Sequence, residues 1–292
     1  MGAALAQTAR FVLQKRLSAS SLSNGGATFA RFVYSAPFVL LIAIAYSSAT
    51  SQNWPNIPNR FWAYALSGGA AQILATMCVV ALFSRRNFAV GITFKKTEVL
   101  MSVVVGFAVL GEGVSGLGFL AIILGLAGVL LLSDPPDATG PLHKRIWNPS
   151  AGLGLLSGVL FAISGVGYRG ASLSLDSGDI FQRAVVTLAC VSLAQVVMLG
   201  AYLLWRERGE VTRVLRAWRV AGLVGLTSMI GSLCWFSAFT LQTVAYVNAL
   251  GQIELFFSLM AGAWLFSETV SKREWQGLSL LTGSILMLVL VT

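Results

Sequence analysis

Ionisable and amide side chains interrupt two long apolar runs at corresponding places in this chain. Lys95, Lys96 and Glu98 lie in the first run, and Gln252 and Glu254 lie in the second. An ionised group at the centre of a membrane helix costs about 2.5–3.5 kcal/mol on insertion scales, so it needs a partner, water or a function. Lys95 and Glu98 are spaced to share a helix face and form an ion pair. Together these groups could bind a polar or charged small molecule.

The two charged places belong to an internal duplication. A charged or amide motif, an apolar run and a Glu-containing boundary occur in the same order in both halves. At one offset, the corresponding residues are Lys96 and Gln252, Glu98 and Glu254, and Glu112 and Glu268. Arg31 likewise corresponds to Arg183 within two matching Phe-x-Arg segments. A duplicated set of apolar segments with ionisable groups inside them is typical of secondary transporters.

The amino-acid composition indicates a membrane protein. Apolar residues make up 56% of the 292 residues and charged residues 11%, and the mean hydropathy is +0.78. A soluble domain has about 25% charged residues, so this chain could not cover itself with polar surface. At about 20 residues per crossing, the length accommodates roughly ten helices. We expect them near residues 3–18, 26–48, 61–84, 88–110, 116–133, 150–170, 179–205, 217–240, 243–267 and 273–291.

The predicted fold is an all-α membrane protein with about ten transmembrane helices, arranged as two inverted five-helix repeats. Residues 1–133 form the first repeat, residues 134–149 a polar linker and residues 150–292 the second repeat. Because each repeat has an odd number of helices, the second must insert upside down relative to the first. A further polar stretch, residues 206–219, is either a basic amphipathic segment on the membrane surface or a solvated loop.

Loop charges indicate which side of the membrane each loop faces. On one side lie Lys15, Arg16, Arg85, Arg86, Lys144, Arg145, Arg206, Arg208, Arg213, Arg216, Arg219, Lys272 and Arg273. The opposite side has Arg60 and Arg169. By the positive-inside rule the basic side is cytoplasmic, which places both termini outside. The net charge of +9 therefore fits the anionic inner face of a lipid bilayer, and nucleic acid is not an expected partner.

The predicted site is a cavity where the two repeats meet, lined by Lys95, Lys96, Glu98, Gln252 and Glu254. Other side chains expected to face it are Asn248, Gln7, Arg10, Trp235 and Tyr246. A water-filled cavity would remove most of the penalty for burying these charges. The alternative interpretation is a buried network of charges and amides that fixes how the repeats pack, with the aromatic residues serving only as packing.

Several other polar residues are expected to have structural roles. Arg31 and Arg183 lie within about two turns of a helix start, where a long side chain can reach the interface or cap a loop. Glu112 and Glu268 follow apolar runs and mark helix boundaries, and Ser115 is the expected N-cap of the helix after the first boundary.

Metal, cofactor and nucleophilic chemistry have no support in the sequence. The one histidine, His143, lies in a polar loop, and the three cysteines lie in apolar segments without CxxC spacing. A metal site, a bound cofactor and a Ser-His-Asp triad are therefore not expected. The chain contains no GxxxxGK[ST] motif, so ATP-driven pumping by this chain is not supported.

On these features the chain resembles the drug/metabolite transporter superfamily, EamA type. The resemblance covers almost the whole length, through the two five-helix halves, their paired arginines, the Glu112 and Glu268 boundaries and the glycine-rich fifth helices. It implies a multi-pass protein of the bacterial inner membrane that exports amino acids or other small metabolites by alternating access, driven by protons or a counter-substrate. Small relatives couple protons through a glutamate in the first helix, where this chain has Gln7, Thr8 and Arg10.

Two alternatives belong to other functional classes. A membrane scaffold or regulatory subunit without transport activity could use a fold derived from a transporter. An intramembrane enzyme would need a catalytic set, and the single histidine, which lies in a loop, offers none at membrane depth. We therefore expect a protein that is not an enzyme.

Overall fold

A computed structural model describes residues 22–83, 95–133, 149–253 and 272–291, together with the single residues 2, 6 and 13. All regular secondary structure in these ranges is helical. The helices of the first half are α2 (Asn24–Val33), α3 (Ala36–Ala49), α4 (Asn59–Phe83), α6 (Glu98–Leu110) and α7 (Gly116–Ser133). Those of the second half are α9 (Pro149–Leu173), α10 (Ile180–Arg206), α11 (Glu210–Arg216), α12 (Trp218–Leu241), α13 (Val244–Gly251) and α15 (Lys272–Val291).

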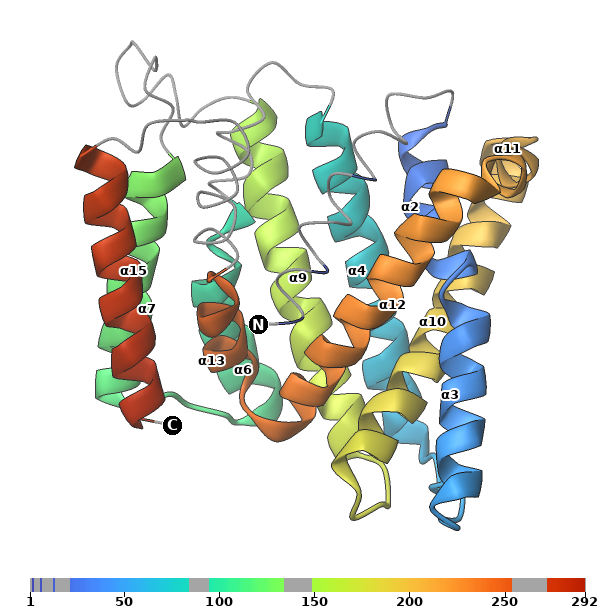
Figure 1. The fold of residues 1–292 in the computed structure, drawn as a ribbon, viewed down its shortest axis with the longest axis horizontal. Coiled ribbons are helices and arrows are strands. Elements are labelled where there is room, and N and C mark those ends of the chain that lie inside the picture. Colours follow the sequence, from blue (N-terminus) through green and yellow to red (C-terminus); the bar gives the residue numbers. More distant parts are fainter. Residues whose placement is uncertain are drawn as a thin grey trace.

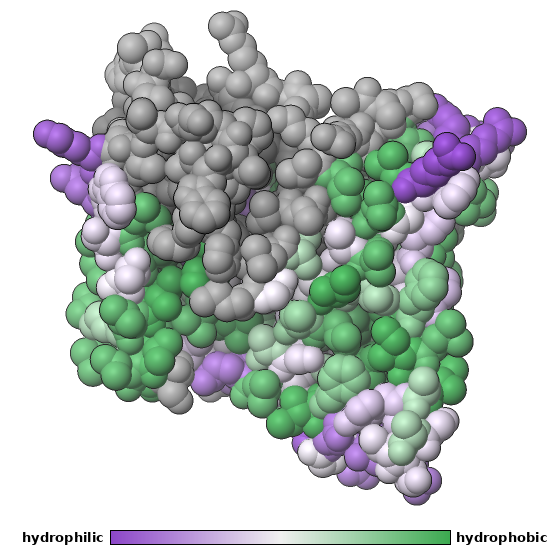
Figure 2. Space-filling view, viewed as in Figure 1, coloured by the Kyte–Doolittle hydropathy of each residue, from purple (hydrophilic) through white to green (hydrophobic). Residues whose placement is uncertain are grey.

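The lengths and surface of these helices fit a bilayer. Five segments of the described chain are long and apolar enough to span a membrane: Asn24–Ala49, Asn59–Leu82, Ala151–Leu173, Ile180–Arg206 and Trp218–Leu241. Figure 2 shows hydrophobic side chains around the middle of the molecule and hydrophilic ones toward its two ends. The prediction of an all-α membrane fold with about ten helices is therefore confirmed. The helix expected near residues 3–18 lies outside the described ranges.

The helix predicted at residues 26–48 is divided in two. Tyr34 and Ser35 form a turn between α2 and α3, and Pro37 occupies the first turn of α3. Proline has no backbone N–H and its ring clashes with the preceding turn of a continuous helix, so the break falls just before it. The Ser35 hydroxyl donates to the carbonyl of Arg31 at 2.8 Å, which satisfies an acceptor freed by the break. The break places Arg31 in the last turn of α2.

The second half is turned over relative to the first. α7 begins at Gly116 and α15 at Lys272, which correspond at the offset of the sequence motifs, yet the two helices run in opposite directions (Figure 1). α4 and α12 are opposed in the same way, as are the α2–α3 segment and α10 (Figure 1). The two repeats of the fold are thus inverted, as the odd number of helices per repeat predicts.

Glycines bring the two repeats into close contact along two helix pairs. A Cβ at Gly167 of α9 would lie 2.8 Å from the carbonyl oxygen of Tyr64 in α4. A Cβ at Gly128 of α7 would lie 2.8 Å from the carbonyl oxygen of Gly277 in α15. Apolar helices gain little from leaving lipid, so such close packing of small residues is what holds them together. We call the α7–α15 contact the glycine seam.

The two ends of the molecule differ in their charges. The polar stretch at residues 206–219 contains a short surface helix, α11, with Arg213 and Arg216 in its last turn. The start of α15, with Lys272, lies at the same end of the molecule as α11, and the end of α15 lies at the opposite end (Figure 1). The loop before α10 belongs to that opposite end and carries Asp176 and Asp179.

Candidate functional site

A pocket, here called the central pocket, lies where the two repeats meet. The first repeat contributes Arg31, Gln72, Lys95 and Glu98 to its lining. The second contributes residues that include Phe161, Tyr168, Ser232, Trp235, Phe239 and Asn248. The centres of water-sized molecules can occupy about 60 Å³ of this pocket. This space is enough for a few waters or a small ligand.

An ion pair forms one wall of the central pocket. Lys95 Nζ lies 3.0 Å from each of the two carboxylate oxygens of Glu98, as their spacing predicted. The Lys95 ammonium also lies 4.9 Å from the ring centroid of Phe161, where the negative face of the ring attracts a cation. The side chains of Lys95 and Glu98 are 5% and 13% exposed, so the pair is largely shielded from bulk water.

The backbone is interrupted beside this pair. Lys96 and Thr97 form a turn, and α6 begins at Glu98. A Cβ at Gly158 of α9 would lie 3.0 Å from the Lys95 carbonyl and 3.2 Å from the Glu98 amide nitrogen, so only glycine lets α9 approach this turn. α13 ends at the corresponding position of the second repeat, where Gln252 begins a turn. Binding sites of inverted-repeat transporters typically form at such discontinuous helices.

Asn248 connects α13 to the same wall. Its amide nitrogen donates to the Ser102 hydroxyl at 2.9 Å, and that hydroxyl donates to the Glu98 carbonyl at 2.7 Å. Asn248 is 7% exposed and lines the central pocket. A side chain of the second repeat is therefore joined by hydrogen bonds to the segment of the first that carries the ion pair.

Arg31 lines the central pocket, although its depth near a helix end favoured a structural role. It is 5% exposed, and its guanidinium donates to the Thr76 hydroxyl at 3.3 Å and to the Ser232 hydroxyl at 3.4 Å. The guanidinium carbon also lies 5.3 Å from the ring centroid of Phe32. The signal that could have drawn attention to Arg31 was the presence of an arginine inside an apolar segment at corresponding places in both halves.

Trp235 also lines the central pocket. Its ring stacks on that of Phe239 with centroids 5.6 Å apart. Its indole nitrogen Nε1 is buried and has no hydrogen-bond partner in the part of the chain that the structure describes. A buried N–H without an acceptor is unfavourable, so Trp235 carries an unsatisfied donor beside the pocket.

Comparison with known proteins identifies the family. The model of the EamA-like transporter family matches residues 1–134 and 148–290, which is nearly the whole chain. The chain belongs to the EamA-like transporter family. It is therefore a multi-pass membrane transporter of the drug/metabolite transporter superfamily, as the sequence resemblance implied. No curated protein matches the chain.

Solved structures support the fold of this EamA-like transporter. A crystal structure of a protein superposes on it with a TM-score of 0.69 and 15% sequence identity, covering 99% of this chain and 96% of that chain. At this identity the likeness establishes the fold alone. Family membership assigns the protein to transporters and not to a family of enzymes.

The other residues that were predicted to face the cavity do not line the central pocket in the part of the transporter that the structure describes. Lys96 and Gln252 line a second, smaller pocket with Ser284 of α15, on the side of α6 and α13 that faces α7. The Tyr246 hydroxyl accepts a hydrogen bond of 3.0 Å from the amide nitrogen of Ser115, at the start of α7. Glu254, Gln7 and Arg10 lie outside the described residues.

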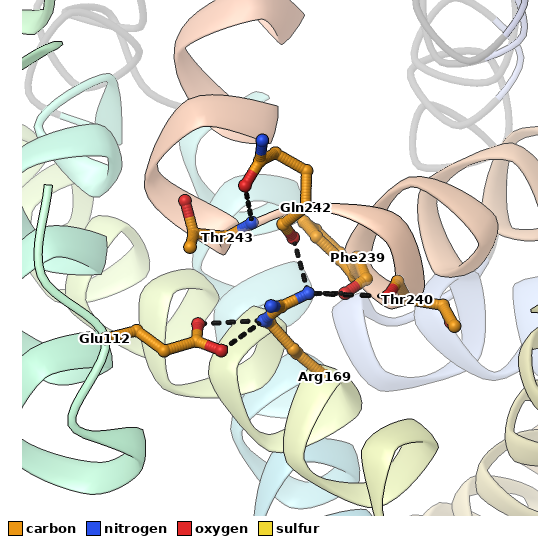
Figure 3. A network of polar contacts seen from close by, with 6 residues as sticks. All are labelled: Glu112, Arg169, Phe239, Thr240, Gln242 and Thr243. Carbon is orange, nitrogen blue, oxygen red and sulfur yellow. Dashed lines mark hydrogen bonds and ion pairs between the residues drawn. The ribbon is translucent and has the colours of Figure 1, made fainter. Parts of the chain in front are cut away.

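The helix-boundary residues behave as capping groups. The Ser115 hydroxyl accepts from the Gly118 amide at 3.0 Å, which confirms it as an N-cap. Arg169 Nε donates to both carboxylate oxygens of Glu112 (Figure 3). Arg169 Nη1 donates to the carbonyls of Phe239 at 2.7 Å and Gln242 at 2.9 Å, at the end of α12 (Figure 3).

The second arginine of the duplicated motif stays outside the central pocket. Arg183 lies in the first turn of α10 and donates from Nε to the carbonyl of Ser177, in the loop before that helix. This is the loop-capping role that its depth predicted. The two arginines thus occupy corresponding positions and have different partners.

Proposed function

We propose that this EamA-like transporter moves small metabolites, such as amino acids or related compounds, across the bacterial inner membrane by alternating access, and that it exports them. The central pocket is the substrate site in this proposal. The observation that carries it is the Lys95–Glu98 ion pair, which lines a pocket at the repeat interface and is joined to Asn248 of the opposite repeat.

The size of the central pocket supports a small substrate. Only about 60 Å³ of it is open to the centres of water-sized molecules. A single amino acid or a compound with one ring suits such a pocket better than a nucleotide sugar, which is several times larger.

The inverted repeats supply a route for alternating access. The pocket walls come from both repeats, residues 1–133 and 150–292, which meet along α4–α9 and the glycine seam. Rocking of one repeat against the other would expose the pocket first to one side of the membrane and then to the other. Inversion makes the two exposed states similar in architecture.

The ion pair also supports a route for coupling. Protonation of Glu98 would release Lys95, so proton binding and substrate binding can compete for the same two side chains. Exchange against a counter-substrate would need no such protonation. The two modes are separated by the response of transport to a pH gradient.

The test is transport by purified protein in proteoliposomes, measured per folded molecule. A counterflow screen of labelled metabolites should identify a substrate for the wild-type protein. Glu98→Gln should then abolish uptake, or leave exchange intact and remove the response to a pH gradient. Asp176→Asn, in an exposed loop, is the matched control and should transport normally. Normal transport by Glu98→Gln would overturn the proposed site.

A further inference from the structure

We infer that the Arg31 end of the central pocket is a subsite for a carboxylate group, and that the preferred substrate is a small organic monoanion with an apolar body. This inference rests on the proposed function and deepens it, because it selects among small metabolites by charge. Four observations carry it. Among the described residues, Arg31 lacks a counter-charge and the indole N–H of Trp235 lacks an acceptor. The other two are the net charge of the described lining and its aromatic walls.

Arg31 offers more hydrogen bonds than its surroundings accept. A guanidinium has five N–H donors in a planar fork. In the described residues, Arg31 contacts the hydroxyls of Thr76 and Ser232 at 3.3 Å and 3.4 Å and the ring of Phe32, and no carboxylate forms an ion pair with it. Its other donors have no acceptor among the described residues, although the side chain is 95% buried. The fork of arginine matches a carboxylate in a bidentate arrangement.

Trp235 provides an independent second donor. Its Nε1 is buried, lacks an acceptor among the described residues and belongs to a side chain that lines the same pocket. An indole N–H can only donate, so it requires an acceptor atom. Arg31 and Trp235 therefore both have donors without acceptors among the described residues.

The charge of the described lining favours a single negative charge on the ligand. Arg31 and Lys95 are cations and Glu98 is an anion, which leaves one positive charge. Lys95 and Glu98 neutralise each other at 3.0 Å, so the surplus lies at Arg31. A buried charge without a counter-charge is strongly unfavourable, and a monoanion supplies the missing partner.

The same arrangement disfavours a zwitterion. An ammonium group needs a carboxylate or carbonyl acceptor, and the Glu98 carboxylate is already bound to Lys95. Lys95 already neutralises that carboxylate, so the ammonium group of an amino acid would gain less there than its carboxylate gains at Arg31. Rings of Phe161, Phe236 and Phe239 line the pocket beside the ion pair and suit an apolar substituent. A simple carboxylate with one ring therefore fits better than the corresponding amino acid.

Four compounds with one shared body test this selection. The probes 3-phenylpropionate, 3-phenylpropionamide, phenylalanine and 2-phenylethylamine are an anion, a neutral isostere, a zwitterion and a cation. Binding is measured as the shift in melting temperature of the purified full chain in detergent, titrated to obtain Kd. We expect the anion to bind about tenfold or more tightly than the amide and the amine, with phenylalanine weaker than the anion.

Three variants locate the subsite. Arg31→Gln should remove the preference for the anion over the amide, and Arg31→Lys should keep part of it. Trp235→Phe retains the ring and removes the N–H, so it should weaken binding of the anion more than that of the amine. Arg183→Gln is the matched control, because it makes the same change at the corresponding residue outside the pocket. It should leave the preference unchanged.

The outcomes separate this inference from the proposed function. No preference for the anion in the wild-type protein, or a preference that survives Arg31→Gln, overturns the subsite. If Arg31→Gln does not fold, binding by Trp235→Phe and Arg31→Lys is compared with that by the wild type. An unchanged preference for the anion in both variants overturns the subsite. Transport that depends on Glu98 without any selection by charge would leave the proposed function standing and remove the subsite. If the protein prefers the anion in an Arg31-dependent way but transports no compound, the subsite stands and the proposed transport function is overturned.

Discussion

Arg169 Nε lies 2.7 Å and 2.8 Å from the two carboxylate oxygens of Glu112, and this ion pair joins the two repeats. Arg169 belongs to α9 of the second repeat, and Glu112 to the loop between α6 and α7 of the first. The side chains are 12% and 20% exposed, so water screens the pair only weakly. The same guanidinium caps the last carbonyls of α12, so three segments depend on one side chain (Figure 3).

Loss of this arginine should destabilise the fold. Arg169→Met leaves the Glu112 carboxylate without its partner and uncaps α12, and we expect a loss of roughly 3 kcal/mol, at the low end for a broken buried pair. Melting in a fixed detergent measures it. Arg208→Met, at an exposed position, is the control and should melt like the wild type. Equal melting temperatures for both variants would show that the ion pair contributes nothing.

The glycine seam gives a prediction about packing. Gly128→Ala would place a Cβ 2.8 Å from the Gly277 carbonyl and 2.9 Å from the Leu281 amide, so the helices must separate. We expect destabilisation of about 1–3 kcal/mol, the usual range for overpacking. Gly222→Ala in α12 meets no atom within 4 Å and should be neutral or stabilising by about 0.5–1 kcal/mol. Similar melting temperatures for the two alanine variants would contradict close packing at the seam.

The charge asymmetry predicts the orientation in the membrane. The end with α11 and the start of α15 carries the arginines and lysine, so it should face the cytoplasm. The C-terminal end of α15 should then face outward (Figure 1). Alkaline phosphatase fused after Thr292 should be active, and a fluorescent protein at the same place should be dark. Bright fluorescence without phosphatase activity would reverse the assignment.

Asp179, the N-cap of α10, gives a prediction about pH. Its carboxylate accepts from the Gln182 amide at 2.7 Å, and this hydrogen bond, with that from the Tyr46 hydroxyl, holds the pKa of Asp179 below its ordinary value. A lowered pKa in the folded state means that the stabilisation is present at neutral pH and is lost as the pH falls through that pKa.

Asp179→Ala should therefore lower stability by about 0.5–2 kcal/mol at pH 7, the usual effect of losing a helix N-cap. The difference from wild type should shrink as the pH falls through the lowered pKa. Melting temperatures of both proteins across an acid series check this. A difference independent of pH would indicate that the charge of the carboxylate plays no part.

Much of the fold could be predicted from the apolar runs. The range expected at 179–205 is observed as Ile180–Arg206, and that at 217–240 as Trp218–Leu241, because charges and turns bound these runs clearly. The spacing of Lys95 and Glu98 also predicted their ion pair. The turn before Pro37 was missed because the apolar run continues on both sides of it, although the proline itself is a signal for a helix break.

The site was harder to predict because neighbouring residues on a helix point in different directions. Lys95 and Lys96 are adjacent, yet Lys95 faces the central pocket and Lys96 the second pocket near α7. Periodicity separates such residues by about 100° and does not say which face meets the other repeat. Arg31 was hard to assign for the same reason. Its side chain points toward the pocket because of where α2 ends and because its guanidinium contacts Ser232 of α12.

The different surroundings of Arg31 and Arg183 have a consequence for what an inverted duplication can recognise. Two identical subunits facing each other across a two-fold axis must present the same groups from both sides, so their shared pocket suits a ligand with two like ends. Joining the copies in one chain removes that restriction. Here Arg31 borders the pocket while Arg183 holds a loop, so the pocket has two unlike ends. Such a pocket can hold a molecule with a distinct head and body in a single orientation.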